Sequence, residues 1–539
     1  CATPHTATAL VLALVSFVIA TRFHLWFAFP YPHPVGFDEG YLGAFSLRLM
    51  NGHWLPYVDA VSQRGPVLYW IAALLQLICG RYSFLGFRIG ALLATWMVIL
   101  SCTALGFVSK RPISGAFASA FYVFAICFGF PTGNMLMGEH LAAPFLTTAL
   151  LLELLAVRDQ SNLKRSLRLL LLSGVLVALA GLSKQTSLSA IPAFLLWAMG
   201  AATAKAPERY KWKLPAALAA GVAIPWLLIF AIYGISGHLR DFYYWFWQFN
   251  IEVYMAPYRD VSRVKAFFDW LQHDVWIVFP LAMLLIGGVS IGLARIKSLS
   301  PRKLGVSIRQ NGLEIVIGIQ AILLIAAAFS TLRLWEHYFV PAMPWLGLLI
   351  GLSTERAFSR SLGWGRWLGR GVFVIGMSAF LWITISRRID GLNKELKAGG
   401  WGDETKDPLC TAIQAHSKPE DAIVVWGFDG DIHVTCARKP ASRLVFMHYV
   451  VGIVPPFWNE PRADRTARGA TQMLLDDLKN NKPVLLVDVP QRLNSRSMLS
   501  VPELSTFIEK EYCRGTEVVG SWGRRATLWY RRDQPDCPK

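Results

Sequence analysis

Apolar runs long enough to cross a lipid bilayer dominate the first 390 residues of this 539-residue chain. Ala7–Phe29, Gly86–Val108 and Leu214–Ile235 each provide the roughly 20 residues that a membrane-spanning helix requires. Further apolar runs cover Pro66–Cys79, Ile113–Phe130, Leu141–Val157, Leu169–Leu182, Leu188–Thr203, Val275–Ala294, Leu313–Ser330, Phe339–Gly351 and Val372–Ile385. Hydrophobic residues make up 54% of the chain and charged residues 16%, so the sequence predicts a polytopic α-helical membrane protein.

The first run and the basic loops predict how the chain is oriented. Ala7–Phe29 is longer than a signal-peptide core, so we interpret it as a retained span, and because the chain starts with Cys1 we expect the native start upstream. Cytoplasmic loops carry an excess of Lys and Arg. Five loops are basic: Lys110-Arg111, Arg158 to Arg168, Lys205 to Lys213, Arg295 to Arg309 and Arg356 to Arg370.

All five basic loops fall on one side only if Pro66–Cys79 lies in the membrane interface or re-enters, because a full span there would place Lys110 outside. We therefore expect about eleven spans plus interfacial helices in the cytoplasmic (inner) membrane, with the C-terminus on the outer face. The outer loops of this domain, residues 1–390, are then 30–65, 132–140, 237–274 and 331–338.

The composition changes after about residue 390, and we expect 391–539 to form a soluble extracytoplasmic α/β domain. Short strands are predicted at Ala422–Phe428, Arg443–Met447, Pro483–Val489 and Ala526–Tyr530, and helices at Pro408–His416, Thr471–Asn480 and Leu504–Cys513. The segment contains Cys410, Cys436, Cys513 and Cys537 in a compartment that permits disulfides. At least one bridge is expected there, and the pairing is left open.

Two adjacent carboxylates, Asp38 and Glu39, follow the first apolar run. Asp38 fits the N-cap of a helix over Glu39–Met50, and it equally fits a general base that takes a proton from an attacking hydroxyl or amine. A neighbouring carboxylate raises one of the two pKa values or helps to hold a metal. The predicted topology favours catalysis, because it brings further polar residues to the same outer face.

Those further polar residues stand at the outer ends of the predicted spans, and each has a simpler interpretation. Arg64 fits a lipid-linked phosphate or ordinary snorkelling to headgroups. Glu139 fits a site residue that orients the acceptor, binds a cation or supports the first acid, or it is the common acid of a helix start. Lys184, followed by Gln185, fits an anion site or a plain outer turn. Arg333, Glu336 and His337 fit phosphate binding and proton donation, or an interfacial polar belt.

Several of these stretches in this order resemble the GT-C superfamily of polyprenyl-phosphate-dependent glycosyltransferases. They are the Asp38-Glu39 pair, the run from Arg64 to Trp70, Arg88 within Gly86–Gly90, the acid of the second loop, Gly181–Gln185 and Glu336–Pro341. The similar branch holds protein O-mannosyltransferases and the lipid A aminoarabinose transferase, and the likeness covers about 30–350. One departure is that the second loop carries Glu139 before His140, where this branch commonly has Asp.

The resemblance implies a polyprenyl-phosphate-linked sugar as donor, inversion at the anomeric carbon, Asp38 as base with Glu39 beside it, and Glu139 as the second-loop acid. Lys184, Arg333 and His337 would face the donor phosphate. No cofactor is implied with certainty, and a divalent cation held by Asp38, Glu139 and His140 stays open.

We therefore expect a membrane glycosyltransferase whose partners are the lipid-linked sugar, an acceptor lipid, glycan or protein, and membrane lipids. A nucleic acid is not expected, because most of the net charge of +18 lies in short loops. A transporter or flippase of lipid-linked sugars is one alternative, although its charges would gather near midspan. A non-catalytic scaffold subunit is the other.

Overall fold

The computed structural model describes residues 4–28, 36–129, 133–158, 162–205, 212–255, 312–331, 335–358, 407–454, 461–535 and 537, with scattered positions between 262 and 390. Contacts divide the chain into two compact units. We call Cys1–His24, Ala91–Ile232 and Val261–Leu392 the helical unit, and Leu25–Gly90, Tyr233–Asp260 and Asn393–Lys539 the mixed unit.

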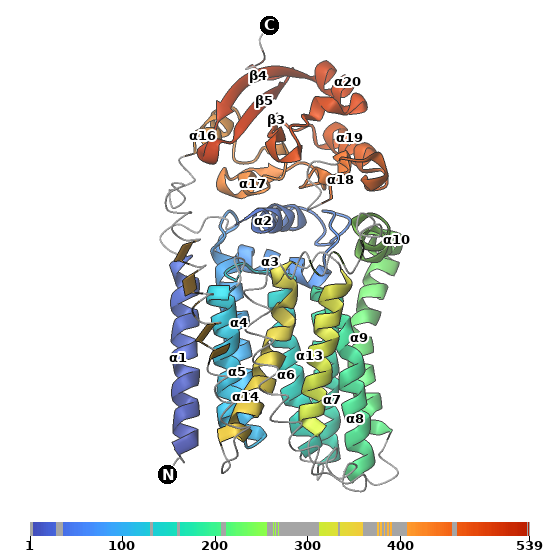
Figure 1. The fold of residues 1–539 in the computed structure, drawn as a ribbon. Helices are drawn as coiled ribbons and strands as arrows, with labels where there is room; N and C mark the ends of the chain where they lie inside the picture. Colours follow the sequence, from blue (N-terminus) through green and yellow to red (C-terminus); the bar gives the residue numbers. More distant parts are fainter. Residues whose placement is uncertain are drawn as a thin grey trace. The chain divides into compact units, whose positions relative to one another are not determined.

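The helical unit consists of apolar helices, with short π-helical or 3-10 segments described beside some of them (Figure 1). Its elements are α1 (Pro4–Trp26), α4 (Leu85–Val108), α5 (Pro112–Phe124), η1 (Ala125–Gly129), α6 (Gly138–Arg158), α7 (Leu163–Ser183), η2 (Gln185–Ala190), α8 (Ile191–Lys205), α9 (Lys213–Ile235), α13 (Gly312–Ser330), η7 (Glu336–Ala342) and α14 (Met343–Phe358). The first residues of α4 and the last residues of α1 and α9 are counted with the mixed unit.

Seven helices in the described part of the chain are long and apolar enough to cross a membrane. They are His5–Trp26, Leu85–Val108, Pro112–Gly129, Gly138–Arg158, Leu163–Ser183, Lys213–Ile235 and Leu313–Ser330. Two further predicted spans form the shorter helices α8 and α14. The predicted runs Val275–Ala294 and, for the most part, Val372–Ile385 lie outside the described residues.

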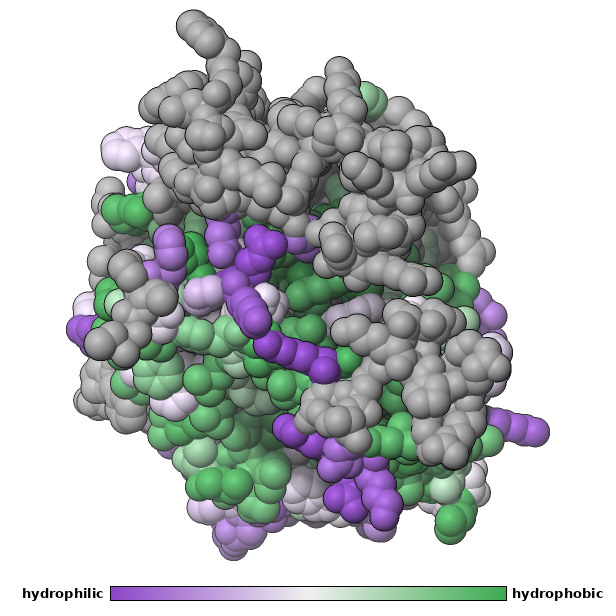
Figure 2. Space-filling view, turned by 90° about the horizontal axis from the view of Figure 1, so that it is seen from below, coloured by the Kyte–Doolittle hydropathy of each residue, from purple (hydrophilic) through white to green (hydrophobic). Residues whose placement is uncertain are grey.

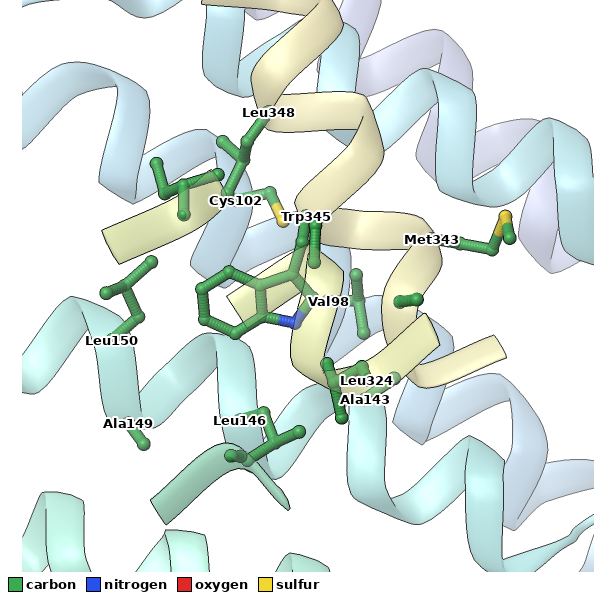
Figure 3. Close-up of a cluster of buried hydrophobic side chains, with 14 of the residues drawn as sticks. Val98, Cys102, Ala143, Leu146, Ala149, Leu150, Leu324, Met343, Trp345 and Leu348 are labelled. Carbon is green, nitrogen blue, oxygen red and sulfur yellow. The ribbon is translucent and has the colours of Figure 1, made fainter. Parts of the chain in front are cut away.

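Trp345 of α14 lies at the centre of the apolar core of the helical unit (Figure 3). Its side chain is fully buried, and it packs among small and branched side chains of several helices. Figure 3 places Val98 and Cys102 of α4, Ala143, Leu146 and Leu150 of α6, and Leu324 of α13 around the indole ring. The core therefore joins helices from both ends of the unit's sequence.

The outward faces of these helices are apolar as well. Green, hydrophobic side chains cover much of the described surface in the space-filling view (Figure 2). Large aliphatic side chains are more than half exposed on α1 (Leu14 and Val18) and on α9 (Leu227 and Leu228). Such a surface is stable in lipid and unfavourable in water, so these helices are suited to a bilayer.

The mixed unit combines short helices with one five-stranded sheet (Figure 1). Its helices are α2 (Phe37–Met50), α3 (Pro66–Cys79), α10 (Leu239–Tyr243), α16 (Pro408–Ala415), α17 (Asp431–Thr435), α18 (His448–Val451), α19 (Ala470–Asn481) and α20 (Pro502–Glu511). Two π-helical segments, η4 (Tyr244–Gln248) and η5 (Asn250–Tyr254), follow α10. Short 3-10 turns are η9 (Ala463–Arg465), η10 (Pro490–Leu493), η11 (Met498–Ser500) and η12 (Ser521–Gly523).

The sheet has the strand order β2-β1-β3-β5-β4. Its strands are β1 (Ala422–Trp426), β2 (Lys439–Pro440), β3 (Leu485–Asp488), β4 (Tyr512–Val519) and β5 (Arg525–Arg531). β2, β1 and β3 are parallel, with Val424 opposite Leu486, whereas β5 runs antiparallel to β3 and β4. β1, β3 and β5 confirm three predicted strands, since their apolar runs line the buried middle of the sheet.

Two of the local predictions for this region are wrong. Arg443–Met447 is not a strand, because β2 takes the place beside β1 and Arg443 instead bonds to Asp477 through its backbone N–H (2.8 Å) and its guanidinium (2.9 Å). The predicted helix Leu504–Cys513 ends at Glu511, and Tyr512 begins β4. β4 is a largely exposed edge strand, so its side chains carry little of the apolar alternation that marks a strand.

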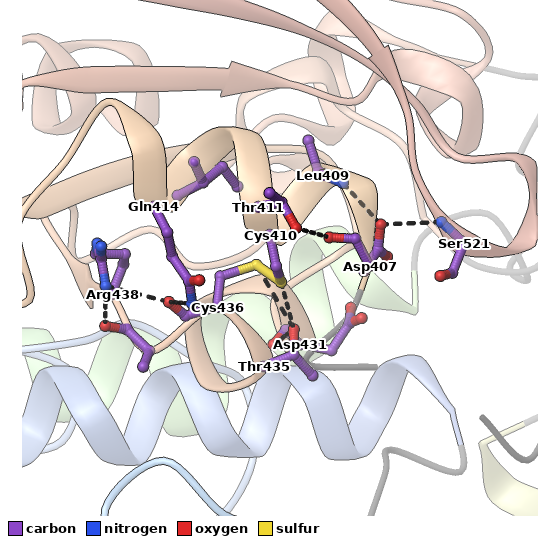
Figure 4. The surroundings of a disulfide bond; sticks show 12 residues. Asp407, Leu409, Cys410, Thr411, Gln414, Asp431, Thr435, Cys436, Arg438 and Ser521 are labelled. Carbon is purple, nitrogen blue, oxygen red and sulfur yellow. Dashed lines mark hydrogen bonds between the residues drawn. A yellow bond between two sulfur atoms is a disulfide. The ribbon is translucent and has the colours of Figure 1, made fainter. Parts of the chain in front are cut away.

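Two disulfides join the four cysteines of this region: Cys410 with Cys436, and Cys513 with Cys537. The expectation of at least one bridge is therefore confirmed. The first bridge links α16 to the residue that follows α17 (Figure 4). Beside it, Asp407 caps α16 by accepting from the Leu409 N–H (2.8 Å), and it also accepts from the Ser521 N–H (3.0 Å).

α17 packs directly on α2, and glycine makes this close approach possible. A Cβ atom at Gly40 would lie 2.7 Å from the backbone nitrogen of Asp431, which is too close for any other residue to fit unchanged. α3 also lies against α2. As predicted, the 14-residue α3 is an apolar helix too short to cross a bilayer in the usual way.

Candidate active site

The first polar cluster begins at the N-terminus of α2. Gly36 is the N-cap, Asp38 and Glu39 lie in the first turn, and no side chain bonds to the cap position. The alternative that Asp38 caps a helix over Glu39–Met50 is therefore wrong, because the helix starts at Phe37. Carboxylates in a first turn are still favoured by the partial positive charge of the helix end.

Asp38 forms an ion pair with Arg64, whose Nη2 donates to Oδ1 of the carboxylate. The side chain of Asp38 is 36% exposed, so a substrate can reach it. Arg64 is fixed just before α3, and its guanidinium also lies 5.6 Å from the centre of the Tyr41 ring. The structure thus brings together one predicted base and one predicted phosphate ligand.

Glu39 has a different environment. Its carboxylate is fully buried, and both of its oxygens accept from Arg88, with 2.6 Å between Nη2 and Oε2. Arg88 also donates to the Phe27 carbonyl oxygen at 3.4 Å. Arg88 belongs to one of the family-like motifs, and its partner Glu39 was not predicted. The signal that could have found the pair is a lone arginine in the apolar run Gly86–Val108.

Asp59, in the loop between α2 and α3, is a structural residue. It is buried, and its Oδ2 accepts from the backbone N–H groups of His53 (2.8 Å) and Leu55 (2.7 Å). These bonds close the turn after α2.

A second polar cluster lies in the helical unit, around Glu139 in the first turn of α6. The Nζ atom of Lys184 lies 2.6 Å from Oε1 of Glu139, and Nε2 of His337 lies 3.9 Å from the same oxygen. Lys184 follows the last turn of α7, and its Nζ also lies 3.9 Å from the centre of the Tyr338 ring. Three predicted site residues from distant parts of the sequence are therefore neighbours.

Backbone packing explains why Glu139 and Lys184 meet. A Cβ atom at Gly138 would overlap the carbonyl oxygen of Ser183, so only glycine allows the start of α6 to touch the end of α7. Glu139 directly follows Gly138, and Lys184 directly follows Ser183, so the two side chains start from neighbouring backbone. Both side chains are mostly buried, at 3% and 17% exposure, so each one offsets the cost of burying the other's charge.

Three further predicted residues, Gln185, Glu336 and His140, lie among the described residues of the helical unit. Gln185 and Glu336 are the first residues of η2 and η7, and both are half-buried. His140 is completely buried beside Glu139, and neither ring nitrogen has a hydrogen-bond partner among the described residues. Arg333 lies outside the described residues.

A metal site at Asp38, Glu139 and His140 remains a prediction. Asp38 belongs to the mixed unit, and Glu139 and His140 belong to the helical unit. In the part of the chain that the structure describes, no group of three or more His, Cys, Asp or Glu side chains is arranged to hold a metal ion.

Comparison with solved structures defines the fold class. The chain is similar to ArnT from Cupriavidus metallidurans bound to undecaprenyl phosphate, with a TM-score of 0.52 and 15% identity over 99% of this chain and 98% of that one. It is similar to the same protein in the apo state, with a TM-score of 0.53 and 14% identity over 98% of each chain. No protein-family model and no curated protein sequence matches the chain.

An archaeal oligosaccharyltransferase, AglB from Archaeoglobus fulgidus in complex with an inhibitory peptide and a dolichol-phosphate, aligns with a TM-score of 0.47 and 14% identity, over 98% of this chain and 75% of that chain. The ArnT likeness extends over almost the whole length of both chains and so includes the apolar helices and the C-terminal sheet. The chain has the GT-C fold, which confirms the fold class predicted from the sequence.

Proposed function

We propose that the chain is a membrane glycosyltransferase that moves a sugar from a polyprenyl-phosphate donor to an acceptor, with inversion at the anomeric carbon. The observation that carries this proposal is the ion pair between Asp38 and Arg64. It joins an accessible carboxylate, which can accept a proton, to a guanidinium, which can bind a phosphate. The ArnT structure that contains undecaprenyl phosphate supports a lipid-phosphate donor.

In this reaction the Asp38 carboxylate takes the proton of the acceptor hydroxyl or amine. The acceptor atom then forms a bond to the anomeric carbon from the side opposite the phosphate. The bond between that carbon and the phosphate oxygen breaks, and its electron pair leaves with the polyprenyl phosphate. A cation is most useful where this negative charge develops, which is the role we assign to Arg64.

Glu39 and the second polar cluster (Glu139, Lys184 and His337) have roles separate from those of Asp38 and Arg64. Glu39 holds the start of α2 against Arg88, since its buried carboxylate is fully engaged by the guanidinium. We assign Lys184 to binding of the donor phosphate, with Glu139 and His337 orienting its ammonium group. Arg333 and Gln185 remain candidates for the same anion on the basis of the sequence.

The test of the proposed base is Asp38→Asn in purified full-length protein in lipid nanodiscs. Single-turnover transfer is measured with a panel of undecaprenyl-phosphate-linked sugars. Asn keeps the shape of the side chain and removes the proton acceptor, so turnover should fall by about 10²–10⁴-fold while donor binding persists. Asp464→Asn is the matched control, because Asp464 also pairs with an arginine, Arg462 (2.9 Å), at an exposed site. Full turnover by Asp38→Asn would contradict the proposal.

We further propose that the sheet of the mixed unit lies on the outer face of the cytoplasmic membrane, as the basic loops predict. Glu517→Cys in β4 and Lys164→Cys at the start of α7 introduce thiols at exposed positions. A membrane-impermeant maleimide added to intact spheroplasts should label position 517, and position 164 only after permeabilisation. Labelling of position 164 in intact spheroplasts would reverse the assignment.

A further inference from the structure

The turn Val61–Arg64, which places Arg64, has no regular secondary structure and is nevertheless bonded from several directions. The Val61 N–H donates to the Arg443 carbonyl oxygen (3.0 Å), and the Val61 carbonyl oxygen accepts from the Tyr41 hydroxyl (2.7 Å). The Arg64 carbonyl oxygen accepts from the Tyr57 hydroxyl (2.6 Å). The turn is thus fixed by α2, by its own loop and by the segment after β2.

Gln63, the residue directly before Arg64, is held by two side chains from distant parts of the mixed unit. The hydroxyl of Tyr449 bonds to its side-chain oxygen Oε1, and Nδ2 of Asn250 donates to its backbone carbonyl oxygen at 2.8 Å. Tyr449 belongs to α18, and Asn250 begins η5. Both backbone and side chain of Gln63 are therefore anchored.

Tyr449 is held in place by a buried aromatic environment. The ring is 1% exposed and packs edge-on against Trp245 (5.2 Å between ring centres) and Phe249 (5.4 Å). Burial raises the pKa of Tyr449 far above the usual value, so the hydroxyl keeps its proton and acts as a donor. The acceptor it meets is the Gln63 amide oxygen.

Asn250 uses its amide group to connect two carbonyl oxygens. Besides the Gln63 carbonyl, its Nδ2 lies 3.1 Å from the carbonyl oxygen of Phe246, within the preceding turn of its own segment. A primary amide has two N–H donors, so both contacts can be made at once. π-Helical turns such as η4 and η5 are uncommon and are frequent at functional sites.

From these contacts we propose that Tyr449 and Asn250 are positioning residues: by anchoring Gln63 they fix the adjacent Arg64 so that its guanidinium points at Asp38. An arginine side chain loses much rotamer freedom when it is held in one geometry. A rigid backbone at its base lowers the further loss when a ligand binds. The effect of these two residues on catalysis rests on the proposed function. Their effect on the position of Arg64 rests on the geometry alone.

The first measurement is hydrogen exchange of the amides in peptides covering residues 61–64, by mass spectrometry of the full-length protein in nanodiscs. Tyr449→Phe removes one hydroxyl and keeps the packed ring, and exchange in this turn should rise by about threefold to tenfold, the worth of one neutral hydrogen bond. Tyr244→Phe is the matched control, since the Tyr244 hydroxyl accepts from the Arg468 N–H (2.7 Å) and leaves the turn untouched. Unchanged exchange in Tyr449→Phe would overturn the proposal.

The second measurement is a double-mutant cycle on single-turnover transfer. Tyr449→Phe should slow transfer by about threefold to tenfold in the wild-type background. It should have no further effect in an Arg64→Ala background, because its influence passes through Arg64. Equal slowing in both backgrounds would indicate a general structural role and would overturn the proposal. If Tyr449→Phe loosens the turn while Asp38→Asn keeps full turnover, positioning stands and the base assignment fails.

Discussion

The ammonium nitrogen of Lys184 lies 2.6 Å from Oε1 of Glu139, so a predicted phosphate ligand is already neutralised by a predicted catalytic acid. The donor phosphate must then share this cation with Glu139 or take it over. Two effects of removing Lys184, on folding and on donor binding, can be separated by changing both partners.

Lys184→Met should weaken binding of the donor by about 1.5–3 kcal/mol, the range for a hydrogen bond to a charged group. It should also lower the melting temperature, because the buried Glu139 carboxylate loses its ammonium partner. The double variant Lys184→Met/Glu139→Gln should recover the melting temperature and leave binding weak. Donor affinity equal to wild type in both variants would remove Lys184 from the phosphate site.

Glu39→Gln should destabilise the protein rather than act on chemistry. The change leaves the buried guanidinium of Arg88 without its anionic partner, at a cost of about 3–5 kcal/mol of unfolding free energy. Thermal unfolding in detergent measures the loss, and the turnover of the folded fraction should stay within a few fold of wild type. A stable Glu39→Gln variant that has lost turnover would mean that Glu39, and not Asp38, is the base.

Removing the bridge between Cys410 and Cys436 should loosen the support of α17. The two residues are 26 positions apart, and a loop of this length corresponds to about 3.5 kcal/mol in the chain-entropy treatment of disulfides. The Cys410→Ser/Cys436→Ser double variant should therefore unfold at lower temperature. Cys513→Ser/Cys537→Ser is the comparison, because that bridge ties down the last described residue of the chain instead of α17.

The stability of the mixed unit should fall as the pH rises from about 4 to about 6. Burial raises the pKa of Asp488, at the end of β3, to about 6 from its ordinary 3.8, although a hydrogen bond from Ser497 opposes the shift. Between these values the folded state keeps a proton that the unfolded state has lost, so raising the pH favours unfolding. Asp488→Asn should flatten this dependence and raise the melting temperature at pH 7. An unchanged pH profile would show that Asp488 titrates normally.

The sequence predicted the features that depend on local composition. Long apolar runs form membrane-length helices, and the short run Pro66–Cys79 forms a helix below that length. The observed bounds of β1, β3 and β5 lie within a few residues of the predicted bounds. The exposed edge strand β4 was missed, because an edge strand needs no apolar alternation. Arg443–Met447 has the composition of a strand, but β2 takes the place beside β1 and Arg443 bonds to Asp477 instead.

Contacts between distant residues were predictable only in part. The basic loops and the family-like motifs drew attention to Glu139, Lys184 and His337, which the structure brings together. The hydrogen bonds from Tyr449 and Asn250 to Gln63 could not be inferred from the sequence, because the residue type of a donor does not determine which oxygen it binds. Partners separated by hundreds of residues are specified by the packing of the whole unit.

The close packing of Gly40 on Asp431 has a consequence for how the protein is made. Gly40 is translated early, whereas its packing partner is added about 390 residues later, and ribosomes that add 5–20 residues per second need roughly 20–80 s for that distance. During this interval α2, with Asp38 in its first turn, lacks α17, which packs on it in the folded protein. Nascent chains stalled before residue 407 should therefore expose this segment to proteases and chaperones, and biogenesis factors that shield it would determine the yield of active protein.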